Sequence, residues 1–272
     1  MLLRSAAIAV AWALADQLYA FAGGEHPTLQ GFASKFLGTL FLVLVFGPAA
    51  QRLPWPFQQR AAVLWATIFT VQTFSTHLEA YYFIDWPLRR IVTSGVAGFF
   101  QALIMAWIVA RLFPPRVEDA TVQSDLRALF QSRHLISWIW RFALADIFYV
   151  FTYFVFGAIA FRFTGPYYLD PAYGLNLKLP ENPLLFKLQL LRSLIYILTM
   201  LPLIAGLRLK KFYMAILIGL VLWVGGGLAP LVAYYHWPVP LRFYHSVEIL
   251  SQNFTTGFIL VYLLGRRIKP IT

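Results

Sequence analysis

The chain has no cysteine, and only 12% of its residues are charged. Without cysteine it can form no disulfide and no thiolate metal site, and it offers no thiolate nucleophile and no c-type haem attachment. So few charged residues cannot coat a globular surface. A soluble fold is therefore disfavoured, and redox chemistry says nothing about the compartment.

Apolar residues make up 60% of the 272 positions, and the mean hydropathy is +0.68. Apolar runs of about 20 residues, the length that crosses a bilayer as a helix, follow one another through the chain. We expect an all-α integral membrane protein with about eight transmembrane helices. The expected spans are 5–23, 34–51, 61–84, 88–113, 136–163, 184–207, 212–235 and 240–265.

The net charge of +11 and the pI near 10.0 would suggest nucleic-acid binding in a soluble protein. Here the basic residues stand at the ends of the apolar runs, mostly on one side, so they form a membrane-edge collar and not a nucleic-acid groove. The positive-inside rule makes that side cytoplasmic, with both termini there, in the cell inner membrane. The collar comprises Arg4, Arg52, Arg60, Arg111, Arg116, Arg127, Arg133, Arg208, Lys210, Lys211, Arg266, Arg267 and Lys269.

Three stretches recur in the same order. ALADQLYAF (13–21) echoes ALADIFYVF (143–151), LGTLFLVLVFGP (37–48) echoes LRSLIYILTMLP (191–202), and AYYFIDWPLR (80–89) echoes AYYHWPVPLR (233–242). The simplest account is a tandem duplication. Four spans per half make the repeats parallel. The expected organisation is a first four-helix repeat (1–113), a cytoplasmic linker (114–135) and a second four-helix repeat (136–272).

The duplication also decides how the first run is interpreted. Residues 5–23 resemble a signal peptide, but their twin lies inside the chain, so we expect both to be retained spans.

Two polar segments lie outside the expected spans. The end of the linker is either an amphipathic helix lying on the membrane, with Val122, Leu126, Leu129 and Phe130 on one face, or a solvated connector. The insert at 165–183 is an external loop or a lid over an outward-facing site.

Ionisable residues inside spans are expensive, so each needs a partner or a function. Asp16 lies about 18 Å beyond Arg4 along a helix, near mid-bilayer, and Asp146 is its twin. Arg192 enters its span about 12 Å from the outer end, a compatible depth. We therefore expect an ion pair between Asp146 and Arg192, and no matching arginine for Asp16 because Gly38 occupies the aligned position. Hydrogen bonding across helices is the structural alternative.

A second cluster is expected in the outer leaflet. His77 and Glu79 end the third span, and Arg242, His245 and Glu248 begin the eighth at spacings of three, which puts them on one helical face. His77, Glu79, His245 and Glu248 could together bind zinc or non-haem iron. A His and Glu pair could also relay protons, or the charges could simply anchor helix ends.

Several sequence signatures are missing. The chain has no glycine-rich phosphate loop, no H-E-x-x-H and no G-x-S-x-G. His77 and His245 are the histidines within expected spans, so a single haem is conceivable and two are not supported. The cofactor stays undetermined.

The second half resembles a family of uncharacterised bacterial polytopic membrane proteins. The resemblance lies in GPYYLDPAYGL, LLRSLIYIL, GGGLAPLV and LRFYHSVEILSQNFTTGFILVYLL. Its motif, R-x-x-H-x-x-E followed by S-Q-N, is here Arg242, His245, Glu248, Ser251, Gln252 and Asn253. It implies a bacterial origin and no particular activity.

Three functions remain open. Repeats with ionisable residues near their interface are typical of secondary transporters, so proton-coupled transport of a small solute is the first hypothesis. Asp16, Asp146 and Arg192 would then form the central site and the outer cluster a relay. A membrane-embedded metal or redox enzyme is the second, and a non-catalytic subunit or assembly factor of a membrane complex is the third. The expected partners are the lipid bilayer and either a second copy or such a complex.

Overall fold

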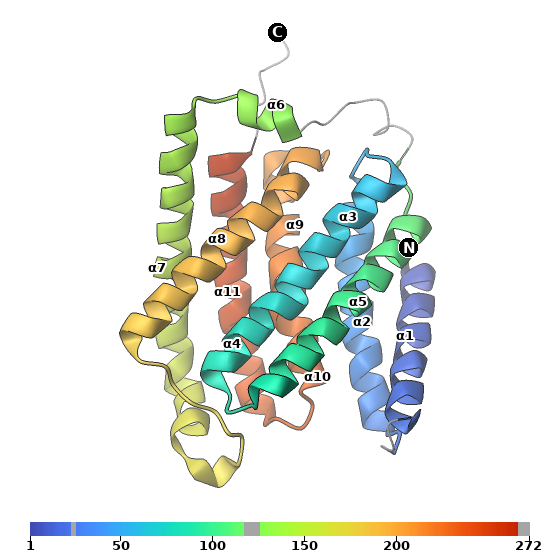
Figure 1. Ribbon diagram of the computed structural model, residues 1–272, viewed down its shortest axis with the longest axis vertical. Coiled ribbons are helices and arrows are strands. Elements are labelled where there is room, and N and C mark those ends of the chain that lie inside the picture. Colours follow the sequence, from blue (N-terminus) through green and yellow to red (C-terminus); the bar gives the residue numbers. More distant parts are fainter. Residues whose placement is uncertain (23–25, 117–125, 266–272) are drawn as a thin grey trace.

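A computed structural model describes residues 1–22, 26–116 and 126–265, and its regular elements there are helices (Figure 1). Six of them are long and apolar enough to cross a membrane: α2, α5, α7, α8, the run Lys211–Ala233 and α11. The chain is therefore an all-helical, multi-pass membrane protein. The elements are α1 (Leu2–Ala22), α2 (Leu29–Gln51), α3 (Phe57–Ile68), η1 (Phe69–Phe74), α4 (Ser75–Phe83), α5 (Leu88–Leu112), α6 (Leu126–Gln131), α7 (Leu135–Leu169), η3 (Pro171–Tyr173), α8 (Asn182–Gly206), α9 (Lys211–Trp223), η4 (Val224–Leu228), α10 (Ala229–Ala233) and α11 (Val239–Leu264).

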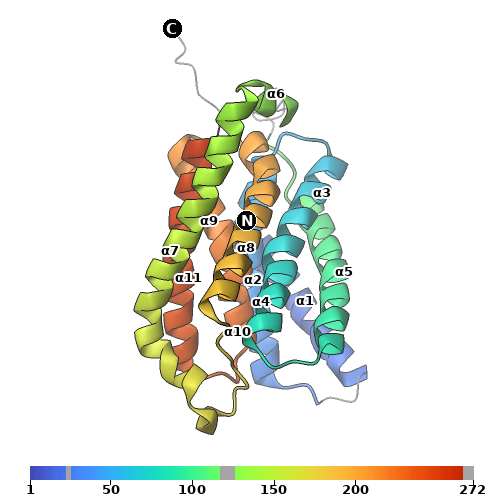
Figure 2. The same ribbon diagram turned by 60° about the vertical axis from the view of Figure 1, so that its left-hand side comes forward.

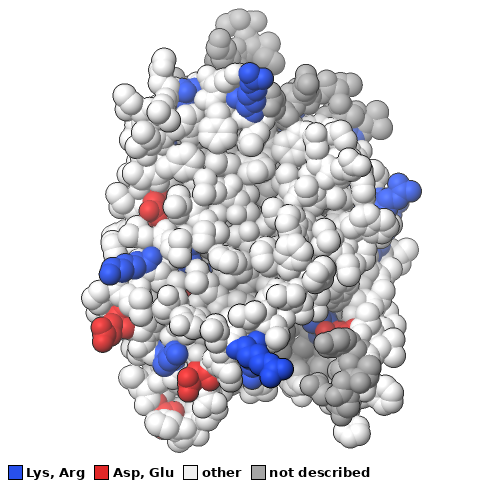
Figure 3. Space-filling model, in the orientation of Figure 1, with Lys and Arg blue, Asp and Glu red and all other residues white. Residues whose placement is uncertain are grey.

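The two other expected spans, 5–23 and 61–84, fall on α1 and on the continuous run α3–η1–α4, which are not among these six. Figures 1 and 2 show the helices running between two ends of the molecule, with α6 lying across one of them. α3 and α8 lie side by side near the centre, whereas α7 packs on α11 and α1 packs on α2. In Figure 3 the middle of the visible face over α3 and α5 is largely uncharged, as a lipid-facing surface requires.

Two helices contain a π-helical segment, and these segments meet at the centre. η1 interrupts the run from α3 to α4, and η4 interrupts the run from α9 to α10. A Cβ atom on Gly225 would lie 2.9 Å from Val71 Cγ1, so a larger residue would require Val71 to shift. Gly225 therefore lets η4 approach η1 closely.

The end of the molecule that carries α6 holds the described part of the predicted basic collar. Several of these arginines bond the last carbonyl groups of helices, where cations are favoured. Arg4 donates to Leu112 O at 2.9 Å and Arg60 to Phe113 O at 3.4 Å, at the end of α5. Arg133 donates to Leu264 O at 2.9 Å, at the end of α11. Arg266, Arg267 and Lys269 lie outside the described residues.

The insert starts later than the sequence suggested. α7 continues through Pro166 to Leu169, so residues 165–169 are helical and not loop. The following segment docks on the turn between α4 and α5: Asp85 N donates to Asn176 O at 3.0 Å, and Lys178 N donates to Phe83 O at 2.9 Å. The segment thus covers the end of the space between α4, α7 and α8. In the linker, α6 is a short helix whose residue Leu129 is buried. Val122 lies outside the described residues.

Glycine also sets the distance between α9 and α11. A Cβ atom on Gly257 would lie 2.5 Å from Ala215 O and 2.6 Å from Gly219 N, both backbone atoms. Small residues at such contacts let membrane helices approach closely, and the backbone cannot move aside for an added methyl group.

We expect Gly257→Ala to lower the unfolding free energy by about 1 kcal/mol, because overpacking costs about 2 kcal/mol and the better helix propensity of alanine offsets about 1 kcal/mol of it. The check is the thermal unfolding midpoint in detergent. Gly95→Ala in α5 is the matched control, since its nearest contact would be His77 Cδ2 at 4.0 Å. Its midpoint should stay the same or rise, and equal shifts in both variants would contradict the packing argument.

Candidate functional site

A cavity of about 420 Å³, here cavity 2, lies within the membrane-spanning helices. Its walls come from α4, α7, α8, α10 and α11, and the docked insert contributes Leu177, Leu179 and Pro180 at one end. Aromatic and aliphatic side chains form most of the lining. The lining also contains two carboxylates, one guanidinium and one imidazole, which belong to Glu79, Glu248, Arg192 and His245. An apolar cavity with a few convergent polar groups is the usual form of a small-molecule site.

Arg192 is the most deeply buried charge of the cavity, with 7% of its side chain exposed. It forms a salt bridge with Glu79 of α4, whose side chain is 26% exposed. Arg192 also donates to Gln189 Oε1 at 2.9 Å and to Tyr196 Oη at 3.3 Å. Gln189 and Tyr196 lie three residues before and four after Arg192, so one face of α8 supplies this polar setting. A buried arginine with such partners is held in one geometry.

His245 and Glu248 form the second pair. His245 Nδ1 lies 2.8 Å from Glu248 Oε2, one helical turn along α11, and only 11% of the Glu248 side chain is exposed. The spacing of three had placed these residues on one face, and the structure brings them together. Arg242, the third member of the predicted set, instead donates from Nε to Trp237 O at 3.0 Å and stabilises the turn before α11.

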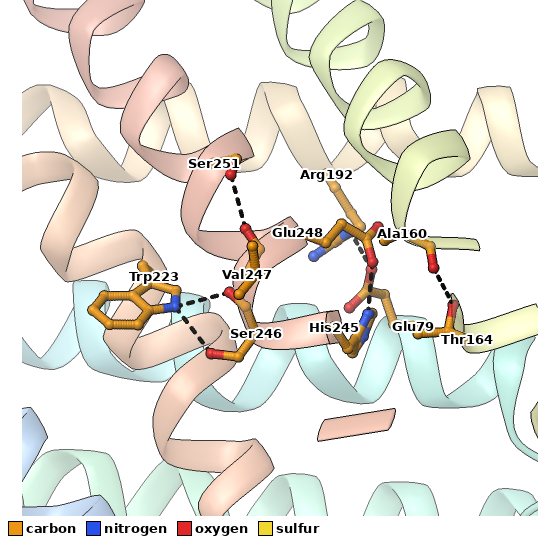
Figure 4. Close-up of polar contacts among 10 residues, drawn as sticks. All are labelled: Glu79, Ala160, Thr164, Arg192, Trp223, His245, Ser246, Val247, Glu248 and Ser251. Carbon is orange, nitrogen blue, oxygen red and sulfur yellow. Dashed lines mark hydrogen bonds and ion pairs between the residues drawn. The ribbon is translucent and has the colours of Figure 1, made fainter. Parts of the chain in front are cut away.

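Figure 4 shows Glu79, Arg192, His245 and Glu248 pointing toward one another from α4, α8 and α11. His77 does not join them. Its Nδ1 lies 2.7 Å from Thr73 O and its Nε2 lies 2.8 Å from Ser94 Oγ of α5. Residues two apart on a helix point in nearly opposite directions, which separates His77 from Glu79.

The predicted metal-ligand set of His77, Glu79, His245 and Glu248 therefore does not form. In the described parts of the chain, no three or more His, Cys, Asp or Glu side chains are placed to hold a metal ion. The pairs with Arg192 and within α11 occupy the carboxylates instead.

The expected ion pair between Asp146 and Arg192 is wrong. Asp146 lies beside Ser193, the residue after Arg192, and a step of one residue on a helix turns the side chain by about 100°. Arg192 consequently faces α4 and pairs with Glu79. Asp146 Oδ1 and Ser193 Oγ are buried without a well-formed hydrogen bond.

Asp16 does have a basic partner, which the comparison of the halves missed. Lys35 Nζ lies 2.8 Å from Asp16 Oδ1, linking α2 to α1. Lys35 stands one turn before Gly38, the position that the sequence comparison aligned with Arg192.

Sequence reasoning also missed most of the uncharged lining. Tyr149 and Tyr153 lie one turn apart on α7, and Gln252 lies one turn beyond Glu248 on α11. The signal was present as spacing, because residues four apart share a helical face. The face of α7 toward the cavity carries Tyr149, Tyr153, Gly157, Phe161, Thr164 and Tyr168.

Comparison with models of known protein families, with curated proteins and with solved structures finds no match. Membership of a family of bacterial membrane proteins therefore stays a prediction from the motif around His245 and Glu248. The functional argument rests on the geometry of the cavity.

Replacing Arg192 or Glu79 singly by leucine should lower the unfolding free energy by about 3 kcal/mol, because each change leaves the other charge buried and unpaired. The double variant should lose much less than the sum, which a double-mutant cycle on thermal unfolding in detergent would measure. Lys187→Leu, an exposed position on α8, is the matched control and should change stability by less than about 0.5 kcal/mol. Additive losses would show that the pair is not coupled.

Proposed function

We propose that the chain spans the membrane eight times, as two parallel four-helix repeats (1–113 and 136–272) joined by the linker 114–135. The additional spans are α1 and the run α3–η1–α4. Three features support the repeat. Pro48 and Pro202 stand near the same end of the second helix of each half, α2 and α8. The third helix of each half contains a π segment.

The third feature is reciprocal packing. α2 of the first half contacts α9 and η4 of the second, and α8 of the second contacts α3 and η1 of the first. The last helix of each half is bonded at its carboxyl end by an arginine near the first helix of that half: Arg4 of α1 bonds α5, and Arg133, two residues before α7, bonds α11. Two halves related by one axis along the membrane normal would repeat their contacts in this way.

The basic end that carries α6 is proposed to be cytoplasmic, in a bacterial inner membrane. The described collar residues at that end satisfy the positive-inside rule. Cavity 2 then lies toward the outer side, under the docked insert.

The protein is proposed to be a proton-coupled transporter of a small solute, with cavity 2 as its binding site. The observation that carries this proposal is the convergence of Glu79, Arg192, His245 and Glu248 in a cavity among membrane-spanning helices. Ionisable groups at this depth cost about 3 kcal/mol each on insertion scales, so they persist where they have a task. Carboxylate and histidine chains are the usual proton carriers of pumps and transporters.

The two pairs suit different parts of that task. Arg192 and Glu79 hold each other across the two halves, so they fix the wall of the site. His245 and Glu248 share one hydrogen bond and can take up or release one proton without losing contact. With two carboxylates against one guanidinium, and aromatic rings around them, the cavity favours a solute with an apolar body and a neutral or cationic polar group.

Because the chain lacks cysteine, single-cysteine variants can test the eight-span topology directly. In intact bacterial cells, a membrane-impermeant maleimide should label Asp85→Cys and Ala172→Cys. It should label Gln58→Cys and Gln131→Cys only after permeabilisation. All four positions are exposed, and they lie near helix ends and in loops rather than on the lipid-facing sides of the helices. Labelling of Gln58→Cys and Asp85→Cys from the same side would show that the run α3–η1–α4 does not cross.

Transport should be visible in proteoliposomes that contain a pH-sensitive dye. Amines, quaternary ammonium compounds, amino acids and sugars are added outside, and at least one class should change the internal pH. Glu248→Gln should abolish the solute-dependent change, because it removes the titratable partner of His245. Asp85→Asn has the same loss of charge outside cavity 2 and should keep it. Folded protein without flux for every class, or full flux in Glu248→Gln, would overturn the proposal.

A further inference from the structure

A second cavity, here cavity 1, is lined mainly by helices of residues 1–113 and has a volume of about 370 Å³. Its walls come from α1, α2, η1, α4, α5 and α10. It shares Thr76, Pro230 and Tyr234 with cavity 2, so these residues stand between the two spaces. The proposed transport function does not use it.

Cavity 1 differs from cavity 2 in the packing of the helices at its outer side. In the second half α7 packs along α11, but the equivalent helices of the first half, α1 and α5, make almost no contact along their length. Arg4 joins them at the α6 end, by its bond to Leu112 O. Figure 1 shows α5 leaning away from α1 toward the opposite end. Ala97 and Gln101 of α5 line the cavity and are exposed, so the cavity reaches the side surface of the molecule, which faces the lipid.

The two cavities also differ in charge. The lining of cavity 1 includes Lys35, Arg90 and His77, and none of its described lining residues is acidic. Hydroxyl and amide side chains such as Ser94, Gln72 and Gln101 complete the polar surface. Cavity 2, in contrast, contains two carboxylates, together with one guanidinium and one imidazole.

The cations of cavity 1 are only partly neutralised. Lys35 has one carboxylate partner, Asp16, and its ammonium group has three hydrogens to donate. The Arg90 guanidinium lies over the Trp86 ring, 4.3 Å from its centre, and forms no ion pair with any described carboxylate. Lys35 is six residues into α2, about 9 Å along the helix, so its charge lies below the membrane surface. Both groups retain donors for an anion.

We propose that cavity 1 binds a phosphate group carried by an amphipathic molecule, which enters between α1 and α5. Lys35 and Arg90 bind the phosphate oxygens, with hydroxyl and amide donors around them. The chain of the molecule lies along the apolar outer face of α5, where Val96 and Phe100 are exposed. The same phosphate chemistry could come from a lipid headgroup or from free phosphate, and the sideways opening favours the lipid.

The test uses the full-length protein in a neutral detergent, with native mass spectrometry and thermal stabilisation as readouts. The probes are short-chain phosphatidylglycerol, diacylglycerol of equal chain length as the lipid without phosphate, and inorganic phosphate. Phosphatidylglycerol should bind at least tenfold more tightly than diacylglycerol. Lys35→Gln and Arg90→Gln should each weaken its binding about tenfold. Lys178→Gln, the same loss of charge on the exposed insert, should not.

Asp16→Asn separates binding from folding, because it removes the carboxylate that competes for Lys35. It should tighten phosphatidylglycerol binding several-fold, whereas damage to the fold would weaken it. If inorganic phosphate binds with the same dependence on Lys35 and Arg90, the site takes a soluble phosphate. If only phosphatidylglycerol does, the occupant is a lipid. Equal binding of the two lipids, or binding that ignores Lys35 and Arg90, would overturn the proposal.

Discussion

The ion pair between Arg192 and Glu79 joins α8 to α4 in the interior of the helical bundle. A single buried charge there would be expelled or neutralised, so each of the two side chains requires the other. The pair holds α8 of the second half against α4 of the first, and it fixes one wall of cavity 2. His245 and Glu248 extend from α11 toward that wall, so their position relative to Arg192 depends on the ion pair.

The helical, membrane-spanning character of the chain follows directly from its composition, because hydrocarbon leaves the backbone few alternatives to a helix. The local pairing of His245 with Glu248 also followed from spacing along one helix. Contacts between helices were harder to predict. The sequence prediction paired Arg192 with Asp146 because the two residues were expected at the same depth in the membrane. The rotation of α8 about its axis could not be predicted in this way, and it turns Arg192 toward α4 and leaves Ser193 beside Asp146.

The missed partner of Asp16 has a similar cause. An alignment of the halves assumes that equivalent positions carry equivalent charges, yet Lys35 stands one turn away from the aligned Gly38. A shift of one turn keeps the helical face and changes the depth. Lys35 of α2 faces Asp16 on α1, whereas Arg192 of α8 faces Glu79 on α4. Lys35 consequently lines cavity 1 and Arg192 lines cavity 2.

The π segment η1 has a geometric consequence for both cavities. A π turn holds one more residue than an α turn, so everything after it is rotated by about 100° relative to an uninterrupted helix. α4 follows η1 directly and carries both His77 and Glu79. The extra residue therefore sets the rotational phase that sends His77 into cavity 1 and Glu79 into cavity 2. A helix of the same sequence with a regular turn at this point would present neither residue where it now lies.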